Sequence, residues 1–217
     1  MGLFASLLLS SPAAFAADTV TGNFASPSGV VFDSGANDRA KAVAVDSSSN
    51  VYVAGKKDQA GGGVDWVVLK LDPSGVLLSS TGFNSGANSF EEPNDAIVAG
   101  GSLIVAGSDA NFSRRLNVYS TATLVQVGGY ADGHDGRFTA VISSGPNSLI
   151  TACVTVNQLM RINEISVPGL VALATATIPG TFDANRNDRS LAWDPSTGHI
   201  FAVAIDSNVG SLHVEEY

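Results

Sequence analysis

Cysteine, basic residues and helical periodicity are all scarce in this sequence, and each scarcity excludes a class of protein. Cys153 is the single cysteine among 217 residues, so no disulfide can form within the chain. Lys and Arg number 11 against 20 Asp and Glu, which gives a formal net charge of −9. A chain this acidic repels phosphate backbones and anionic lipid, so nucleic acid and membrane surfaces are not expected as partners. No stretch keeps apolar residues at helical spacing over three turns, so helices should be nearly absent.

Motifs of familiar catalytic and nucleotide-binding sites are missing as well. The sequence contains no Gly-x-Ser-x-Gly elbow, no P-loop and no dinucleotide fingerprint that leads from a strand into a helix. His134, His199 and His213 share no ligand spacing with one another or with Cys153, so zinc is not expected. Cys153 lies in the apolar stretch "SLITACVTV", which favours a buried, inert thiol over a nucleophile. We therefore expect no cofactor, with calcium as the one ion to weigh.

The first seventeen residues, "MGLFASLLLSSPAAFAA", differ from the rest of the chain. A short apolar run leads to small residues of the kind that signal peptidase prefers, although no Lys or Arg precedes it. The run is too short to span a bilayer. We interpret residues 1–17 as a signal peptide and residues 18–217 as a single domain, with a buried N-terminal strand as the alternative. The mature protein is then secreted or periplasmic, without membrane insertion after signal removal.

The rest of the chain contains an internal sequence repeat. Four segments combine a polar or glycine turn with an apolar, β-branched run, and they begin about fifty residues apart, the spacing typical of β-propeller blades. They are "SNVYVAG" (49–55), "GSLIVAG" (101–107), "NSLITAC" (147–153) and "GHIFAVA" (198–204). Other short apolar runs precede and follow each copy across turn residues such as Gly100-Gly101. The pattern predicts four short antiparallel strands per copy, with Val53, Val105, Ala152 and Ala202 near the core.

The sequence therefore predicts an all-β fold, a β-propeller of four four-stranded antiparallel blades. The fourth copy ends after three strands, and "SGVVFDSG" (28–35) matches the missing strand position. We expect residues 28–34 to pair with 210–216, so that the N-terminal strand closes the last blade and removes an exposed sheet edge. The alternative is an incomplete part of a larger propeller, completed by another chain or by sequence outside this one.

Blade one resembles a known family. The stretch "RAKAVAVDSSSNVYVAG" followed by "DWVVLKLDPSG" is similar to the bacterial SBBP-type β-propeller repeat of secreted and surface proteins. The match is clear over residues 38–75, and the later blades are degenerate. The resemblance implies a propeller scaffold and no particular reaction, because one fold hosts many functions.

Polar loops between successive copies are the candidate binding site. "DSGANDR" (33–39) returns as "DANRNDR" (183–189), and related turns lie at 84–88 and 132–137. In a propeller such crossing loops gather on one face around the axial channel. Two interpretations stay open: turn-forming residues that cap backbone N–H groups, or a polar mouth that binds a ligand. The candidate ligand-binding residues are Asp38, Arg39, Asp95, His134, Asp135, Asp188 and Arg189.

A calcium site and a glycosylation site are weaker candidates. Asp183, Asn185 and Asn187 occupy alternate positions of an acidic loop, as in a calcium-binding loop, and Asp194 falls at its twelfth position. The strand-like stretch "RSLAWD" should however carry Asp194 away from that loop. Asn111 begins an Asn-Phe-Ser sequon, which matters only in a eukaryotic secretory pathway.

Two functions from different classes fit these features. The first is an exported, non-catalytic propeller that binds a protein, peptide or glycan at its loop face, or serves as a structural module. The second is a metal-dependent hydrolase or lyase with its site at the channel mouth. The enzyme would need Asp38, Asp95, His134, Asp135 and Asp188 to converge.

Export has a direct test. Because "SSPAAFAA" precedes an acidic stretch, N-terminal sequencing of secreted material should begin at Ala17 or Asp18. A folded cytosolic protein that retains Met1 would contradict the signal-peptide interpretation.

Overall fold

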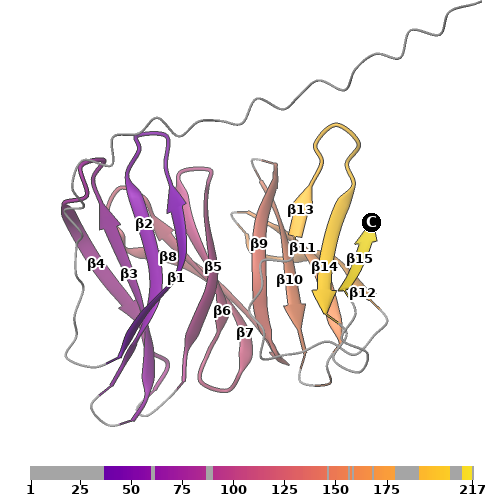
Figure 1. Ribbon diagram of the computed structural model, residues 1–217, viewed down its shortest axis with the longest axis horizontal. Coiled ribbons are helices and arrows are strands. Elements are labelled where there is room, and N and C mark those ends of the chain that lie inside the picture. Colours follow the sequence, from indigo (N-terminus) through magenta and orange to yellow (C-terminus); the bar gives the residue numbers. More distant parts are fainter. Residues whose placement is uncertain are drawn as a thin grey trace, which may run out of the picture.

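The computed structural model consists of β-strands joined by tight turns (Figure 1). It describes residues 37–59, 62–86, 90–145, 147–155, 157, 159–167, 169–178, 191–205 and 212–216. These residues form fifteen strands and, within the described ranges, no helix, as the lack of helical periodicity predicts. No helix in this part of the chain is therefore long and apolar enough to cross a membrane.

The strands form four successive antiparallel sheets, the four predicted blades. Each predicted apolar run between residues 38 and 216 coincides with a strand. In blades one to three the four strands pair in chain order, and blade four has three strands over the described residues. Blade one comprises β1 (Asp38–Val45), β2 (Val51–Asp58), β3 (Val64–Leu71) and β4 (Leu77–Phe83). Blade two comprises β5 (Glu92–Ala99), β6 (Ser102–Ser108), β7 (Ser113–Ser120) and β8 (Gln126–Asp135). Blade three comprises β9 (Arg137–Gly145), β10 (Ser148–Val154), β11 (Met160–Ser166) and β12 (Ala172–Ile178), and blade four comprises β13 (Leu191–Trp193), β14 (Ile200–Ile205) and β15 (Leu212–Glu216).

Turn residues act as their chemistry predicts. Gly100 and Gly101 both have positive φ, 55° and 77°, in the hairpin between β5 and β6. The Asp46 carboxylate accepts hydrogen bonds from the Ser48 and Asn50 amides, each at 2.9 Å, and so closes the turn between β1 and β2. Equivalent aspartate turns recur at Asp72, Asp109 and Asp194.

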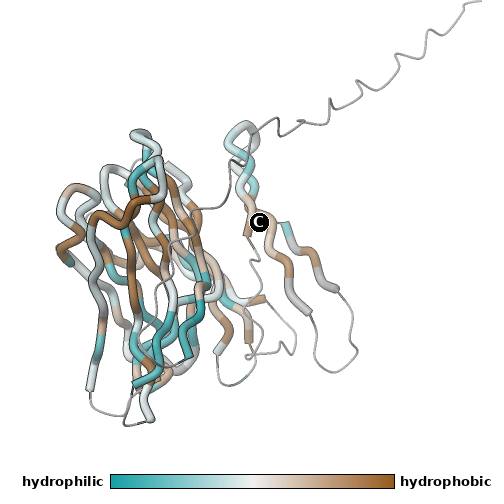
Figure 2. Tube along the Cα trace, turned by 60° about the vertical axis from the view of Figure 1, so that its left-hand side comes forward, coloured by the Kyte–Doolittle hydropathy of each residue, from teal (hydrophilic) through white to brown (hydrophobic). Residues whose placement is uncertain are grey.

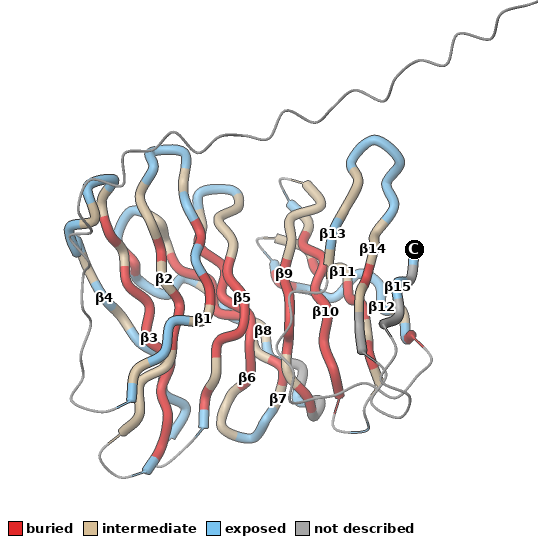
Figure 3. Tube along the Cα trace, in the orientation of Figure 1, coloured by how far each residue is buried: buried red, intermediate tan, exposed pale blue. Residues whose placement is uncertain are grey.

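Alternation along the second strand of each blade builds the core. In β2, Tyr52 and Ala54 face blade two, while Val51 and Val53 face the other way. In β6, Ile104 and Ala106 face blade three, and the alternate residues Leu103 and Val105 face blade one. The same alternation in β10 and β14 produces a third apolar cluster between blades three and four. Every large core cluster therefore lies between two blades (Figure 3).

Three of the four residues predicted to lie near the core are buried. Val105, Ala152 and Ala202 are at most 1% exposed. Val53 is only half-buried, because its face of blade one has no described blade packed on it. Trp66 of β3 is fully buried, and its Nε1 donates a hydrogen bond to the Ser108 carbonyl of blade two.

The four blades lie in a row, with blade one and blade four at its opposite ends (Figure 1). Contacts between blades join β1 to β5, β5 to β9 and β9 to β13, so the first strand of each blade is the inner one. The expected closing strand at 28–35 lies outside the described residues. The pairing of residues 28–34 with blade four therefore stays a prediction.

Replacement of Val105 by Asp tests the assignment of faces. The substitution would bury an unpaired charge in the cluster between blades one and two, so we expect it to lower the free energy of unfolding by about 3–5 kcal/mol. Val53→Asp, on the face that no described blade covers, should cost clearly less in a single copy of the chain. Urea denaturation measures both, and equal losses would contradict the assignment.

Candidate functional site

The inner strands of blades one, two and three begin with a charged residue at an equivalent register position. These residues are Arg39, Glu92 and Arg137, and each directly precedes the inner-strand partner of Gly55, Gly107 or Cys153 of the second strand. The two glycines are required by close packing: a Cβ on Gly107 would lie 2.1 Å from the Glu92 carbonyl oxygen. Hydrophilic segments gather at this end of the blades (Figure 2), which we call the mouth.

A β-bulge follows two residues after each of these positions. The register of the inner strand slips by one residue in all three blades, and the extra residues are Lys41, Asn94 and Thr139. A bulge re-aims a side chain that would otherwise follow the alternation of the strand. Lys41 and Asn94 each reach the next blade as a result.

Asp95, a predicted ligand-binding residue, lies between two blades. It is 1% exposed, and its Oδ2 accepts a hydrogen bond from the Val141 amide of β9 at 3.0 Å. Beside it, Asn94 Nδ2 donates to the Phe138 carbonyl at 2.7 Å. These contacts connect the inner strands of blades two and three. Asp95 is thus committed to the scaffold, which removes one member of the carboxylate set that the enzyme hypothesis needs.

Three cationic side chains meet the Glu92 carboxylate. Lys41 Nζ lies 2.7 Å and Lys56 Nζ 3.4 Å from Oε1, while Arg137 lies 3.4 Å from Oε2. The four side chains are between 14% and 21% exposed, so they are shielded but reachable from solvent. We call these four residues the Glu92 cluster. Its cations come from β1, β2 and β9, so it joins the first three blades at the mouth.

The Glu92 cluster carries more positive than negative charge, in contrast to the acidic chain as a whole. Three cations share one carboxylate, which leaves two positive charges in excess. At physiological ionic strength charges are screened over about 8 Å, so a ligand at the mouth experiences these groups more than the distant acidic surface. The cluster can therefore attract a carboxylate or another anionic group.

The pKa of Glu92 is lowered by these partners. Partial burial by itself raises the pKa of the carboxyl group, because it disfavours the charged form. The hydrogen bond and charge of Lys41, with the charges of Lys56 and Arg137, act in the opposite direction and prevail. Glu92 is therefore held as a carboxylate at neutral pH.

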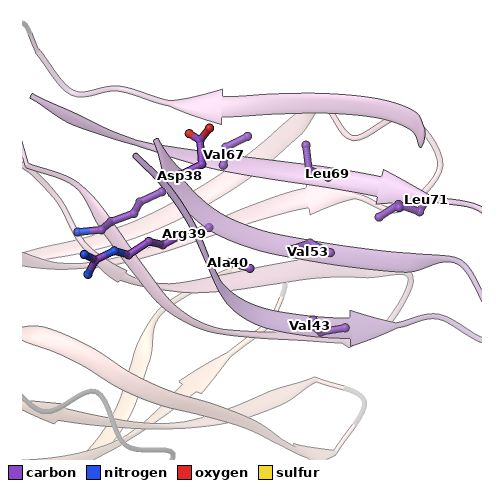
Figure 4. A pocket seen from close by; sticks show the side chains of 10 residues that line it. Asp38, Arg39, Ala40, Val43, Val53, Val67, Leu69 and Leu71 are labelled. Atoms are coloured by element: carbon purple, nitrogen blue, oxygen red, sulfur yellow. The ribbon is translucent and has the colours of Figure 1, made fainter. Parts of the chain in front are cut away.

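An open groove runs along blade one beside the mouth (Figure 4). Its volume is about 430 Å³. The predicted residues Asp38 and Arg39 lie at its polar end, whereas Val43, Val53, Leu69 and Leu71 form an apolar floor toward the other end. The structure thus brings Asp38 and Arg39 together with Lys56, which also lines the groove.

The other predicted site residues are not brought together in the described part of the chain. His134 and Asp135 belong to the end of β8, where only the backbone is described. Asp188 and Arg189, and the calcium candidates Asp183, Asn185 and Asn187, lie outside the described residues. Among the described residues, no group of three or more His, Cys, Asp and Glu side chains is placed to hold a metal ion.

Four further predicted features do fall within the described part of the chain. Asp194 Oδ1 accepts a hydrogen bond from the Ser196 amide at 2.8 Å in the turn after β13, while the acidic loop itself lies outside the described residues. The Nδ1 atom of His199 contacts the Glu216 carboxylate on blade four. Asn111 is exposed in the turn between β6 and β7. Cys153 is buried as predicted, and Arg114 donates to its Sγ at 3.0 Å.

Sequence reasoning missed Lys41, Lys56, Glu92 and Arg137. Glu92 and Arg137 could have been found by an alignment of the inner-strand starts, because they occupy the register position of Arg39. Lys41 could not have been found in this way, because the direction of its side chain depends on the β-bulge. Lys56 directly follows the repeated run of residues 49–55, and the equivalent residues of blades two and three, Ser108 and Val154, carry no charge.

Four antiparallel blades with their inner strands side by side define the chain as a β-propeller protein with a charged mouth. No family model and no curated protein matches the sequence, so the SBBP-type resemblance stays an expectation. Among solved structures, the chain is similar to the Dos1 propeller, with a TM-score of 0.54, 14% identity, and coverage of 80% of this chain and 47% of that one.

Two other solved structures show the same fold. A chain of the Mitotic Checkpoint Complex matches with a TM-score of 0.53 and 14% identity, over 99% of this chain and 61% of that one. A protein of unknown function from Bacteroides caccae matches with a TM-score of 0.51 and 12% identity, over 83% of this chain and 61% of that one. This chain therefore spans between about half and three-fifths of the length of these structures.

Glu92→Gln tests the contribution of the Glu92 cluster to stability. A lowered pKa in the folded state means that the stabilisation is present above the ordinary glutamate value of 4.5 and is lost as pH falls through the folded value. We expect the variant to be less stable than the parent by roughly 1 kcal/mol at pH 7. The difference should shrink below pH 4.5, as measured by urea denaturation across a pH series. A pH-independent difference would contradict the ion-pair origin.

Proposed function

We propose that this protein is an exported, non-catalytic binding module that binds an acidic segment of a protein or peptide at the mouth. The observation that carries the proposal is the convergence of Lys41, Lys56 and Arg137 on the single carboxylate of Glu92. Export rests on the composition of residues 1–17 alone.

The chemistry of the cations favours a carboxylate ligand. Arg137 presents a planar guanidinium, which can form paired hydrogen bonds with a carboxylate, and its guanidinium also lies 5.7 Å from the ring centre of Phe112. The lysines add mobile point charges on the same side. An extended acidic peptide could thus exchange its carboxylates for that of Glu92 without leaving any cation unpaired.

Arg39 extends the same surface toward the groove. It is exposed at the start of β1, and its backbone pairs directly with Lys56 across the β1–β2 ladder. A peptide that follows the mouth from β9 to β1 would therefore meet cations at both ends of its path, with Glu92 between them and Asp38 beside Arg39. The apolar floor beside Arg39 offers contacts for uncharged side chains.

Binding of a fluorescent peptide of ten glutamates provides the test. We expect saturable binding at low ionic strength that weakens as salt is added, because screening shortens the reach of the cluster. Lys56→Gln should reduce the affinity about five-fold, the effect of removing one charge about 4 Å away in water. Fluorescence anisotropy measures each affinity.

Two matched variants make the result specific to the mouth. Lys57→Gln removes the same charge from the neighbouring position, where the ammonium pairs with Asp65 instead, and should leave the affinity unchanged. Glu92→Gln should raise the affinity, because the cations lose their internal carboxylate. Equal losses in the Lys56 and Lys57 variants, or equal binding of a ten-lysine peptide, would refute the proposal.

A further inference from the structure

The back face of blade one is an apolar surface with no described blade packed against it. Val43 and Val45 of β1 are 54% and 55% exposed. Behind them, Val67, Leu69 and Leu71 of β3 form a small apolar cluster that is separate from the three clusters between blades. This face forms the floor of the groove in Figure 4.

The repeat itself identifies what this surface is built to pack against. Val51 and Val53 occupy the positions of Leu103 and Val105 in blade two, which pack against the preceding blade. In blade four the corresponding residues, Ile200 and Ala202, pack against blade three. The back face of blade one is thus shaped to receive the front face of another blade.

A matching front face lies at the other end of the row. In β14 of blade four, Phe201 and Val203 alternate with the core residues Ile200 and Ala202 and so point away from blade three. Val214 of β15 pairs with Val203 and is 59% exposed. These positions correspond to the blade-one residues Tyr52 and Ala54, which pack on blade two.

We propose that two copies of this chain associate head to tail, with the front face of blade four of each copy on the back face of blade one of the other. Two such contacts close a ring of eight blades. Blades one and four of a single copy lie at opposite ends of the row, so they do not meet each other in the described structure (Figure 1).

The contact area is sufficient for a stable dimer. A blade face of four strands about 4.8 Å apart and roughly 20 Å long covers roughly 400 Å². Each copy contributes one four-stranded face and one face of three described strands, so each copy would bury roughly 700 Å², within the range typical of a specific interface. The faces are apolar, as expected for a permanent assembly.

The mass of the secreted protein in solution tests the proposal. We expect light scattering during gel filtration to give twice the mass of one chain. Val43→Lys and Val214→Glu should each give a folded monomer, because both side chains are exposed in a single copy. Val127→Lys, at a position 63% exposed on β8, is the matched control and should leave the dimer intact.

Mixing the two monomeric variants distinguishes this ring from other arrangements. A Val43→Lys copy and a Val214→Glu copy can form one interface without substitutions and one that pairs opposite charges, so the mixture should regain the dimer mass. A monomeric parent protein would overturn the proposal in favour of closure within one chain or by a different partner. Assemblies larger than two copies, or a dimer that neither substitution affects, would also overturn it.

Discussion

Packing of one apolar blade face on the next is the interaction on which this structure depends. A single four-stranded sheet buries little by itself, and each large apolar cluster lies between two blades. The alternation of β-strand side chains supplies both faces: Tyr52 faces forward and Val53 backward in the same strand. Each interface between blades therefore adds to the stability of the chain. The back face of blade one and the front face of blade four are the two places where a further blade could pack.

The polar chemistry of the mouth is a consequence of this stacking. Asn94 and Asp95 are buried because blade three covers them, and the hydrogen bonds that Asn94 Nδ2 and Asp95 Oδ2 make with the backbone of β9 compensate part of the loss of water. The repeated bulge turns Lys41 toward Glu92 of the next blade. The same inner strands thus provide the connection between blades and a cluster of cations at their exposed ends.

Aspartates in the turns have a different role, because they close the hairpins. The pKa of Asp46 is lowered chiefly by the Asn50 side chain, and the pKa values of Asp72 and Asp194 chiefly by Ser74 and Ser196. Each carboxylate also accepts backbone N–H groups of its own hairpin. These contacts are local, so the turn motif alone specifies them.

The sequence by itself determined the strands, the turns and the number of repeats, because alternation and turn chemistry act between residues close in the chain. It also correctly placed Cys153 in the interior. Only the tertiary structure decided that Lys41 meets Glu92, since these residues are in different blades and a bulge sets the direction of the lysine. It likewise decided that Val105 is buried while the equivalent Val53 is not. A strand residue is buried only where a neighbouring blade packs on its face, and the local sequence pattern does not indicate whether such a blade is present.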